Sequence, residues 1–155
     1  MLVSALHKST LKFVSSVNEV KVSNEEWIIN PDLSAVEGVD KSLWVIEGNT
    51  VRQKNQDELN AILEEQKQNL INRIYDLYQE CEIFNITPAG AIQLAEWCAY
   101  GRPKAMADRQ WIIDLYDERD AKLDLVEAGD LSVDPHPSTP IKPFSFRELK
   151  EENDK

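Results

Sequence analysis

Apolar residues recur every three or four positions between residues 55 and 84, and this spacing predicts a long amphipathic helix. Asn55 followed by Glu58 is typical of a capping-box start. The first half of the helix carries few apolar residues, and the second half carries many. We therefore expect the first half to be an exposed or self-associating arm and the second half to enter the core.

Two further helices are predicted by their end signals. Thr87 and the proline after it suit a helix start, and the pattern continues over residues 88–100 until Gly101. A third helix is predicted over residues 103–128, beginning at a proline and ending at Gly129.

Tryptophan occurs four times, and two of these residues lie in the apolar stripes of the second and third predicted helices. We expect Trp97 and Trp111 to be mostly buried between those helices. Trp27 and Trp44 lie in strand patterns. Core packing explains all four better than stacking on a carbohydrate, which stays open as an alternative.

The N-terminal third shows short apolar runs that predict strands. The runs cover residues 11–17, 20–22, 27–29, 43–46 and 50–52. A hairpin turn is expected over residues 15–19, and Gly48-Asn49 suits a second, two-residue turn. The sequence predicts a small antiparallel sheet of three to five strands.

Prolines crowd the C-terminal end, where residues 130–143 are expected to form an extended strap. Phe144 and Phe146 are two positions apart and would share one side of an extended chain. We expect both to anchor the strap on a neighbouring subunit or a different protein. A disordered tail is the alternative.

These elements indicate an α+β protein. It comprises a small antiparallel β module (residues 1–54), a three-helix bundle with long first and third helices (residues 55–129) and a proline-rich extended C-terminal tail (residues 130–155) that includes the strap. The long helices leave apolar surface for another copy or another protein. The expected contact residues are Leu59, Ile62, Leu63, Leu70, Ile74, Leu77, Phe144 and Phe146. Irregular spacing around Gln66 argues against a long regular supercoil.

A net charge of −11 disfavours binding to duplex nucleic acid, which requires a basic surface. No apolar run approaches the roughly 18 to 20 residues of a membrane span. The first residues lack the pattern of a secretory signal. We therefore expect neither nucleic acid nor membrane among the partners.

Candidate chemistry is sparse. Cys81 and Cys98, with the isolated His7 and His136, do not match a familiar metal-site spacing, and free thiols are expected. An acidic cluster on the third helix comprises Asp114, Asp117, Glu118, Asp120 and Asp124. It is interpreted as a solvated face in which Glu118 pairs with Lys122, and cation binding stays open. Phosphate-binding glycine loops are not evident, so no cofactor and no catalytic residue is assigned.

Two segments carry a resemblance. Residues 30–51, NPDLSAVEGVDKSLWVIEGNTV, resemble a module of small bacteriophage tail and tail-fibre-associated proteins. Residues 95–122, AEWCAYGRPKAMADRQWIIDLYDERDAK, are similar to helical ends of cyanobacterial and phage structural proteins. The resemblance implies a virion component assembled in the host cytoplasm, without enzyme activity, with other virion proteins as partners. It favours a homo-oligomer, and a trimer among these.

Two alternatives stay open. The chain could be a tail-fibre assembly chaperone that leaves the finished particle. It could also be a small enzyme or a sugar-binding module of the host-recognition apparatus, which would need a convergent acid pair or an exposed tryptophan groove.

Overall fold

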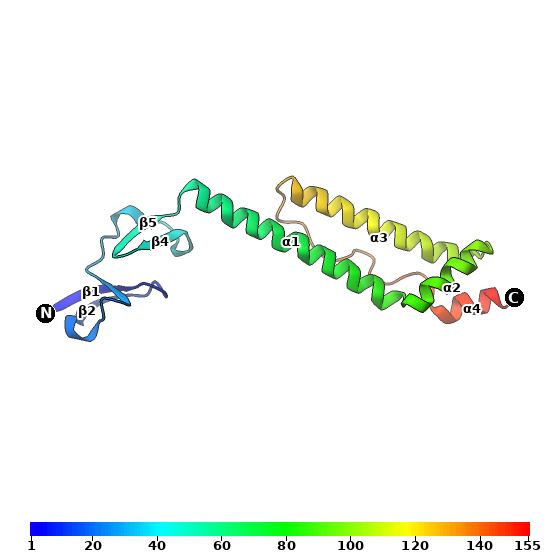
Figure 1. The fold of residues 1–155 in the computed structure, drawn as a ribbon, viewed down its shortest axis with the longest axis horizontal. Helices are drawn as coiled ribbons and strands as arrows, with labels where there is room; N and C mark the ends of the chain where they lie inside the picture. The colour runs from blue at the N-terminus through cyan, green and yellow to red at the C-terminus, as the bar shows by residue number, and fades with distance from the viewer. The chain divides into compact units, whose positions relative to one another are not determined.

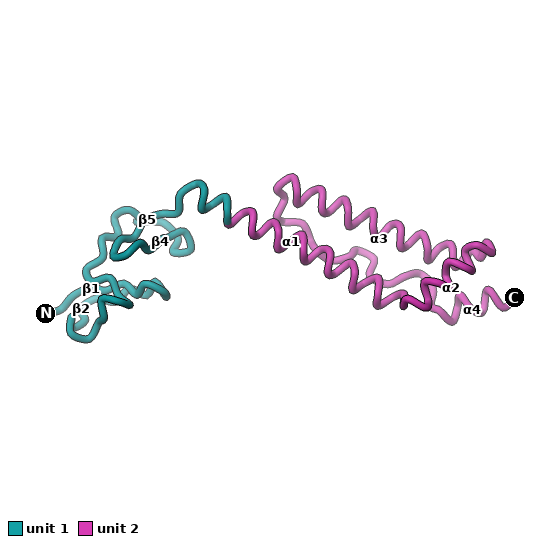
Figure 2. Tube along the Cα trace, in the orientation of Figure 1, with its two compact units in different colours: residues 1–61 teal, residues 62–155 magenta.

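The computed structural model describes residues 1–155 and divides into two compact units, residues 1–61 and residues 62–155 (Figure 2). Unit 1 contains two small antiparallel sheets. The helix α1, Gln56–Asn85, begins in unit 1 and continues into unit 2, which also contains the other three α-helices (Figure 1). The chain is thus a mixed α+β protein, as expected.

The first sheet has the strand order β2-β1-β3. Its strands are β1 (Leu2–His7), β2 (Phe13–Asn18) and β3 (Trp27–Ile29), and both outer strands pair antiparallel with β1. The central strand β1 was not expected from the sequence. Its apolar positions do not alternate strictly, because Ala5 and Leu6 are adjacent and both fully buried.

Two expectations about this sheet are wrong. The hairpin turn falls between β1 and β2, at residues 8–12, and residues 15–19 mostly belong to β2 itself. Residues 20–22 were expected as a strand, but Glu19–Lys21 form a 3₁₀ turn capped by Asn18. Ser16 has a φ of 57°, and the register shifts opposite it between Val3 and Ala5, so β2 carries a bulge there.

The second sheet is the hairpin of β4 (Trp44–Glu47) and β5 (Thr50–Gln53). The Gly48-Asn49 turn is confirmed, and Gly48 has the positive φ of 61° that such a turn requires. The core of unit 1 joins residues from both sheets and from a connecting turn. Its buried members are Leu6, Ile28, Val36 and Val51.

The start of α1 is confirmed. The amide N–H of Glu58 donates to Asn55 Oδ1 at 2.9 Å, and the amide N–H of Asn55 donates to Glu58 Oε2 at 3.0 Å. Arg52 adds two hydrogen bonds, from Nη1 to Glu58 Oε2 at 2.9 Å and from Nη2 to Glu58 Oε1 at 2.6 Å. This bidentate contact ties β5 to the first turn of α1.

The ends of the next two helices are also confirmed. The helix α2 spans Pro88–Ala99 with Thr87 as its cap, and α3 spans Pro103–Glu127. A fourth helix, α4 (Phe146–Asn153), replaces the end of the expected extended tail. Ser145 and Glu148 form a complete capping box at its start. The C-terminal region is therefore extended only as far as Ser145.

The strap, residues 128–145, connects α3 to α4 and runs alongside α1 and α3 (Figure 1). The main core of unit 2 joins α1 to α3, and Leu131 and Val133 of the strap pack against it. Its buried residues are Ile71, Ile74, Tyr78, Trp111, Leu115 and Val126. A second cluster joins α2, α3 and α4 through Leu94, Trp97, Ala105 and Leu149.

Both helical tryptophans are buried, as expected, but only one of them lies between α2 and α3. Trp97 packs with Ala105 of α3 and with Leu149 of α4. Trp111 belongs instead to the cluster with α1, and its indole N–H donates to the carbonyl of Thr139 in the strap at 2.9 Å.

Replacing Trp111 by alanine should lower the free energy of unfolding by about 3 to 5 kcal/mol, because it opens a large cavity in the main core. Chemical denaturation measures this value. A Trp111→Phe variant keeps the apolar ring, loses the bond to Thr139 and should lose less stability. A Trp111→Ala variant as stable as the parent would contradict the core role.

The contact between β5 and the first turn of α1 should weaken at acid pH. Hydrogen bonds from Arg52 lower the pKa of Glu58 to about 2, whereas an unfolded glutamate titrates near 4.3. The stabilisation is therefore complete above about pH 4.3 and disappears as the pH falls towards 2. Titration of the Glu58 carboxyl by NMR checks this, and Arg52→Gln should return its pKa towards the ordinary range. An unchanged pKa in that variant would refute the assigned cause.

Candidate interaction surface

One buried ion pair fixes the strap to the helices of unit 2. Asp108 of α3 has no exposed surface, and its Oδ2 lies 2.6 Å from Lys142 Nζ. Its Oδ1 accepts from the backbone N–H of Phe144 at 2.9 Å. Lys142 Nζ also donates to the carbonyl oxygen of Phe144. A buried carboxylate requires such partners, so this pair joins α3 to the last residues of the strap.

Asn85, the last residue of α1, holds the strap from the other side. Its Nδ2 donates to the carbonyl of Pro140 at 2.8 Å, and its Oδ1 accepts from the backbone N–H of Lys142 at 3.0 Å. Nearer the start of the strap, Glu118 accepts from the N–H and the hydroxyl of Ser138 at 2.9 and 2.7 Å. The strap thus docks on its own chain at several points.

The two phenylalanines have different positions. Phe144 is half-buried against the cluster of α2, α3 and α4, and the Lys104 ammonium lies 5.2 Å from the centre of its ring. Phe146 is the first residue of α4 and remains 52 % exposed, with its ring 5.4 Å from that of Trp97. They do not share one side of an extended chain, because Ser145 begins a helix between them.

The structure divides the expected contact residues of α1. Ile74 is fully buried in the core of unit 2, whereas Leu70 and Leu77 are half-buried. Leu59 and Ile62 are half-buried as well, and Leu63 is 52 % exposed. Ile74 is therefore occupied by its own chain and is not free for another protein.

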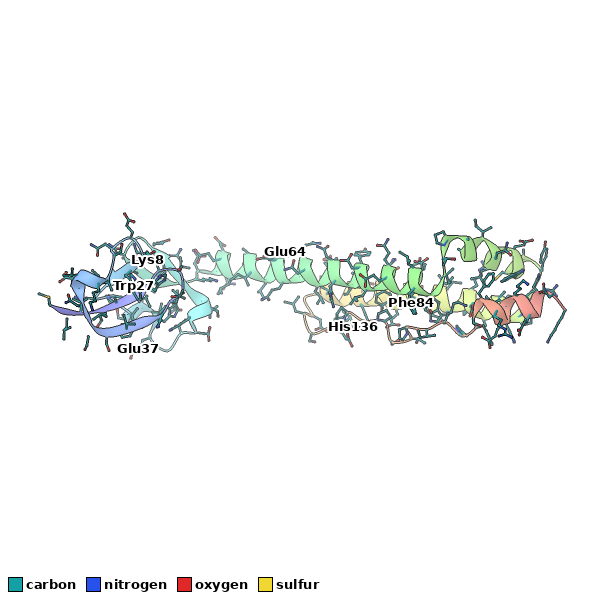
Figure 3. The ribbon with its side chains drawn as sticks, turned by 90° about the horizontal axis from the view of Figure 1, so that it is seen from below. Lys8, Trp27, Glu37, Glu64, Phe84 and His136 are labelled. Atoms are coloured by element: carbon teal, nitrogen blue, oxygen red, sulfur yellow. The ribbon has the colours of Figure 1, made fainter.

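Phe84, near the end of α1, was not among the expected contact residues, although it is 79 % exposed (Figure 3). It follows Leu63, Leu70 and Leu77 at intervals of seven residues. Seven residues are nearly two helical turns, so the four side chains lie close to one line along the helix. We call Leu63, Leu70, Leu77 and Phe84 the α1 stripe. The seven-residue interval was the signal that could have identified Phe84.

Several of the other candidate groups pair with side chains nearby on the same helix. Within the acidic cluster of α3, Glu118 forms an ion pair with Lys122 at 3.2 Å, as expected, and Asp120 pairs with Arg119. Asp114 accepts a hydrogen bond from Gln110. The structure brings together no group of three side chains suited to a metal ion.

The two cysteines are free thiols, as expected. Burial raises the pKa of both Cys81 and Cys98, so their thiolate forms are disfavoured. His7 and His136 lie in different units. His7 Nδ1 accepts from the N–H of Ser9, and His136 Nδ1 lies 2.8 Å from Asp134.

Comparison of the chain with protein-family models, with curated proteins and with solved structures finds no match. None of its helices has the length and apolar character needed to cross a membrane.

Replacing Lys142 by methionine should lower the free energy of unfolding by about 3 to 5 kcal/mol, because it leaves the buried Asp108 carboxylate without its counter-charge. The double variant Asp108→Asn, Lys142→Met removes that charge and should recover part of the loss. Lys150→Met, in an exposed pair with Asp154, is the matched control and should change stability by less than about 1 kcal/mol. Urea denaturation compares the variants. Equal stability of the Lys142 and Lys150 variants would contradict a structural role for the buried pair.

Proposed function

We propose that this chain is an assembly protein that acts through protein–protein contacts, as a structural component of a phage virion in the tail, the baseplate or a tail-fibre-associated position. The observation that carries the proposal is the α1 stripe. Its apolar side chains extend along one helix, and the two end members, Leu63 and Phe84, are more than half exposed.

The spacing of the α1 stripe fits contact with another helix. A seven-residue repeat is the period at which one helix packs along another in a shallow supercoil. Each large apolar side chain contributes about 1.5 to 3 kcal/mol when it is fully removed from water. We infer that the partner helices come from other copies of the chain, and we favour a trimer.

The internal packing limits how long this contact can be. A regular supercoil needs two apolar positions in each seven-residue repeat, and the α1 stripe supplies only one of them. Ile74 falls at the other position, but it is buried against α3 in its own chain. Lys67 pairs with Glu127, the last residue of α3, at 3.0 Å. We therefore propose a short helical contact along one edge of α1 instead of a long regular supercoil. In this proposal α1, α2 and α3 form a bundle with the α1 stripe on its surface, and the strap and α4 pack against that bundle.

The virion part of the proposal rests on the resemblance of residues 30–51 and 95–122 to phage structural proteins. A small β unit linked to a helical unit with a partly exposed apolar stripe is consistent with a protein that binds others. A sugar-binding module is less well supported by the helical tryptophans, because Trp97 and Trp111 are both buried.

Replacing Leu63 and Phe84 together by serine should abolish the trimer, because it removes the two most exposed members of the α1 stripe. Light scattering at micromolar concentration measures the mass. Ile83→Ser is the matched control, since Ile83 is 57 % exposed on the same helix but lies outside the stripe. A parent protein that is a monodisperse monomer would contradict self-association through the stripe.

Mass spectrometry of purified phage particles separates a virion component from a chaperone. A virion component is present in the particles in a fixed ratio to other structural proteins. An assembly chaperone is absent from them and is recovered from infected-cell lysate with the fibre protein. Absence from both would overturn the phage assignment.

A further inference from the structure

The helix α2 is apolar on two opposite faces. Its inner face buries Leu94 and Trp97 against α3 and α4. The opposite face is also apolar but is exposed to solvent, and its one large side chain, Ile92, is 71 % exposed. We call this the α2 face, and it comprises Ala91, Ile92, Ala95 and Ala99. An exposed apolar face beside a buried one is typical of a contact site for another protein, so the α2 face indicates a partner.

A groove continues the α2 face onto α3. It has a volume of about 440 Å³, and residues of both helices line it. Its lining includes Ala95, Cys98 and Ala99 of α2 and Arg109 and Ile112 of α3. Beyond the groove, Met106 and Ile113 of α3 are 52 % and 41 % exposed. The apolar surface is therefore wider than α2 alone.

Arg109 is the one charged residue that lines this groove, and it has no partner within its own chain. It forms no ion pair and no side-chain hydrogen bond, although acidic residues outnumber basic ones in the chain by 28 to 17. Its neighbours one turn away on α3 are apolar, namely Ala105, Met106, Ile112 and Ile113. Arg109 is therefore free to pair with a carboxylate of another chain.

The α2 face itself carries such a carboxylate on its other border. Glu96 is exposed, and its Oε1 accepts a hydrogen bond from Tyr100 at 3.0 Å. At 100° per residue, Glu96 and Cys98 fall on opposite sides of the line through Ala95 and Ala99. Because Cys98 lines the groove with Arg109, the positive and negative charges flank the apolar face from opposite sides.

We propose that the α2 face is a two-fold contact with a second copy of the chain, with the symmetry axis nearly parallel to α2. Rotation about such an axis exchanges the two borders of the face. Glu96 of each copy then meets Arg109 of the other, at the level of Ala95 and Ala99 where both residues lie. Small side chains at positions 91, 95 and 99 allow the two helix backbones to approach closely.

The charges select this orientation over the alternative. A two-fold axis perpendicular to α2 would make the two α2 helices antiparallel. Each border of the face would then meet the same border of the other copy. Arg109 would then face Arg109, and Glu96 would face Glu96. In the parallel arrangement Arg109 of each copy pairs with Glu96 of the other, so two attractions replace the two repulsions. The charges therefore favour the parallel dimer over the antiparallel one.

The contact should be weak on its own. A helix of 12 residues is about 18 Å long, and a standard interface buries about 800 Å² on each partner, so Met106 and Ile113 of α3 must take part. Each copy also carries a net charge of −11, which opposes association until salt screens it. The α2 face shares no residue with the α1 stripe, and the inference does not depend on the proposed function.

A charge-swap experiment tests the proposal by sedimentation equilibrium at physiological ionic strength. Arg109→Glu and Glu96→Arg should each raise the dissociation constant of the dimer about tenfold or more, because each places two like-charge pairs across the axis. The double variant, which exchanges the two charges, should restore dimerisation to within about threefold of the parent. Lys12→Glu is the matched control, with the same charge change at an exposed residue of unit 1, and should have little effect.

Circular dichroism melting shows whether each variant is folded. Recovery of dimerisation in the double variant shows that the single variants fail because of charge and not because of misfolding. Association that weakens equally in Arg109→Glu and Lys12→Glu, or a double variant weaker than both single ones, would overturn the pairing. So would a parent that stays monomeric or dissociates only when the α1 stripe is changed. That last result would leave the proposed function intact, which separates the two proposals.

Discussion

The C-terminal third of the chain depends on one buried carboxylate. Asp108 has no exposed surface, and a charge in that position is tolerated only when it is paired and hydrogen-bonded. Both partners, the Lys142 ammonium and the Phe144 amide, come from the strap. Ser145 follows at once and begins α4, whose Leu149 covers Trp97. The need of the buried Asp108 carboxylate for partners therefore fixes the end of the strap, and with it the start of α4.

Local signals in the sequence were sufficient for the helix ends. Asn55 with Glu58, Thr87 before a proline, and the glycine after α3 act through neighbouring backbone groups, and such effects do not depend on the rest of the fold. The same logic applied to Ser145 and Glu148 would have identified α4. Prolines before them and the charged residues after them outweighed that signal, although neither prevents a short capped helix.

Pairings between distant residues could not be predicted in this way. Asp108 lies between Ala107 and Arg109 in a stretch that looks like a solvated helix surface. Its partner is 34 residues away, so only the folded chain shows that it is buried. For the same reason the sequence assigned Ile74 to the contact residues of α1, whereas it packs against α3 in its own chain. Strand β1 was missed because its burial depends on strands to both sides.

The indole of Trp111 links the state of the strap to a spectroscopic signal. Its N–H donates to the Thr139 carbonyl, so separation of the strap from α3 would change the chemical shift of that indole proton and expose the ring to water. The indole N–H of Trp44 donates a comparable bond to the carbonyl of Val39 within unit 1 and supplies an internal reference. The chain thus carries its own reporter, and any detachment of the strap can be followed by NMR or fluorescence without a label.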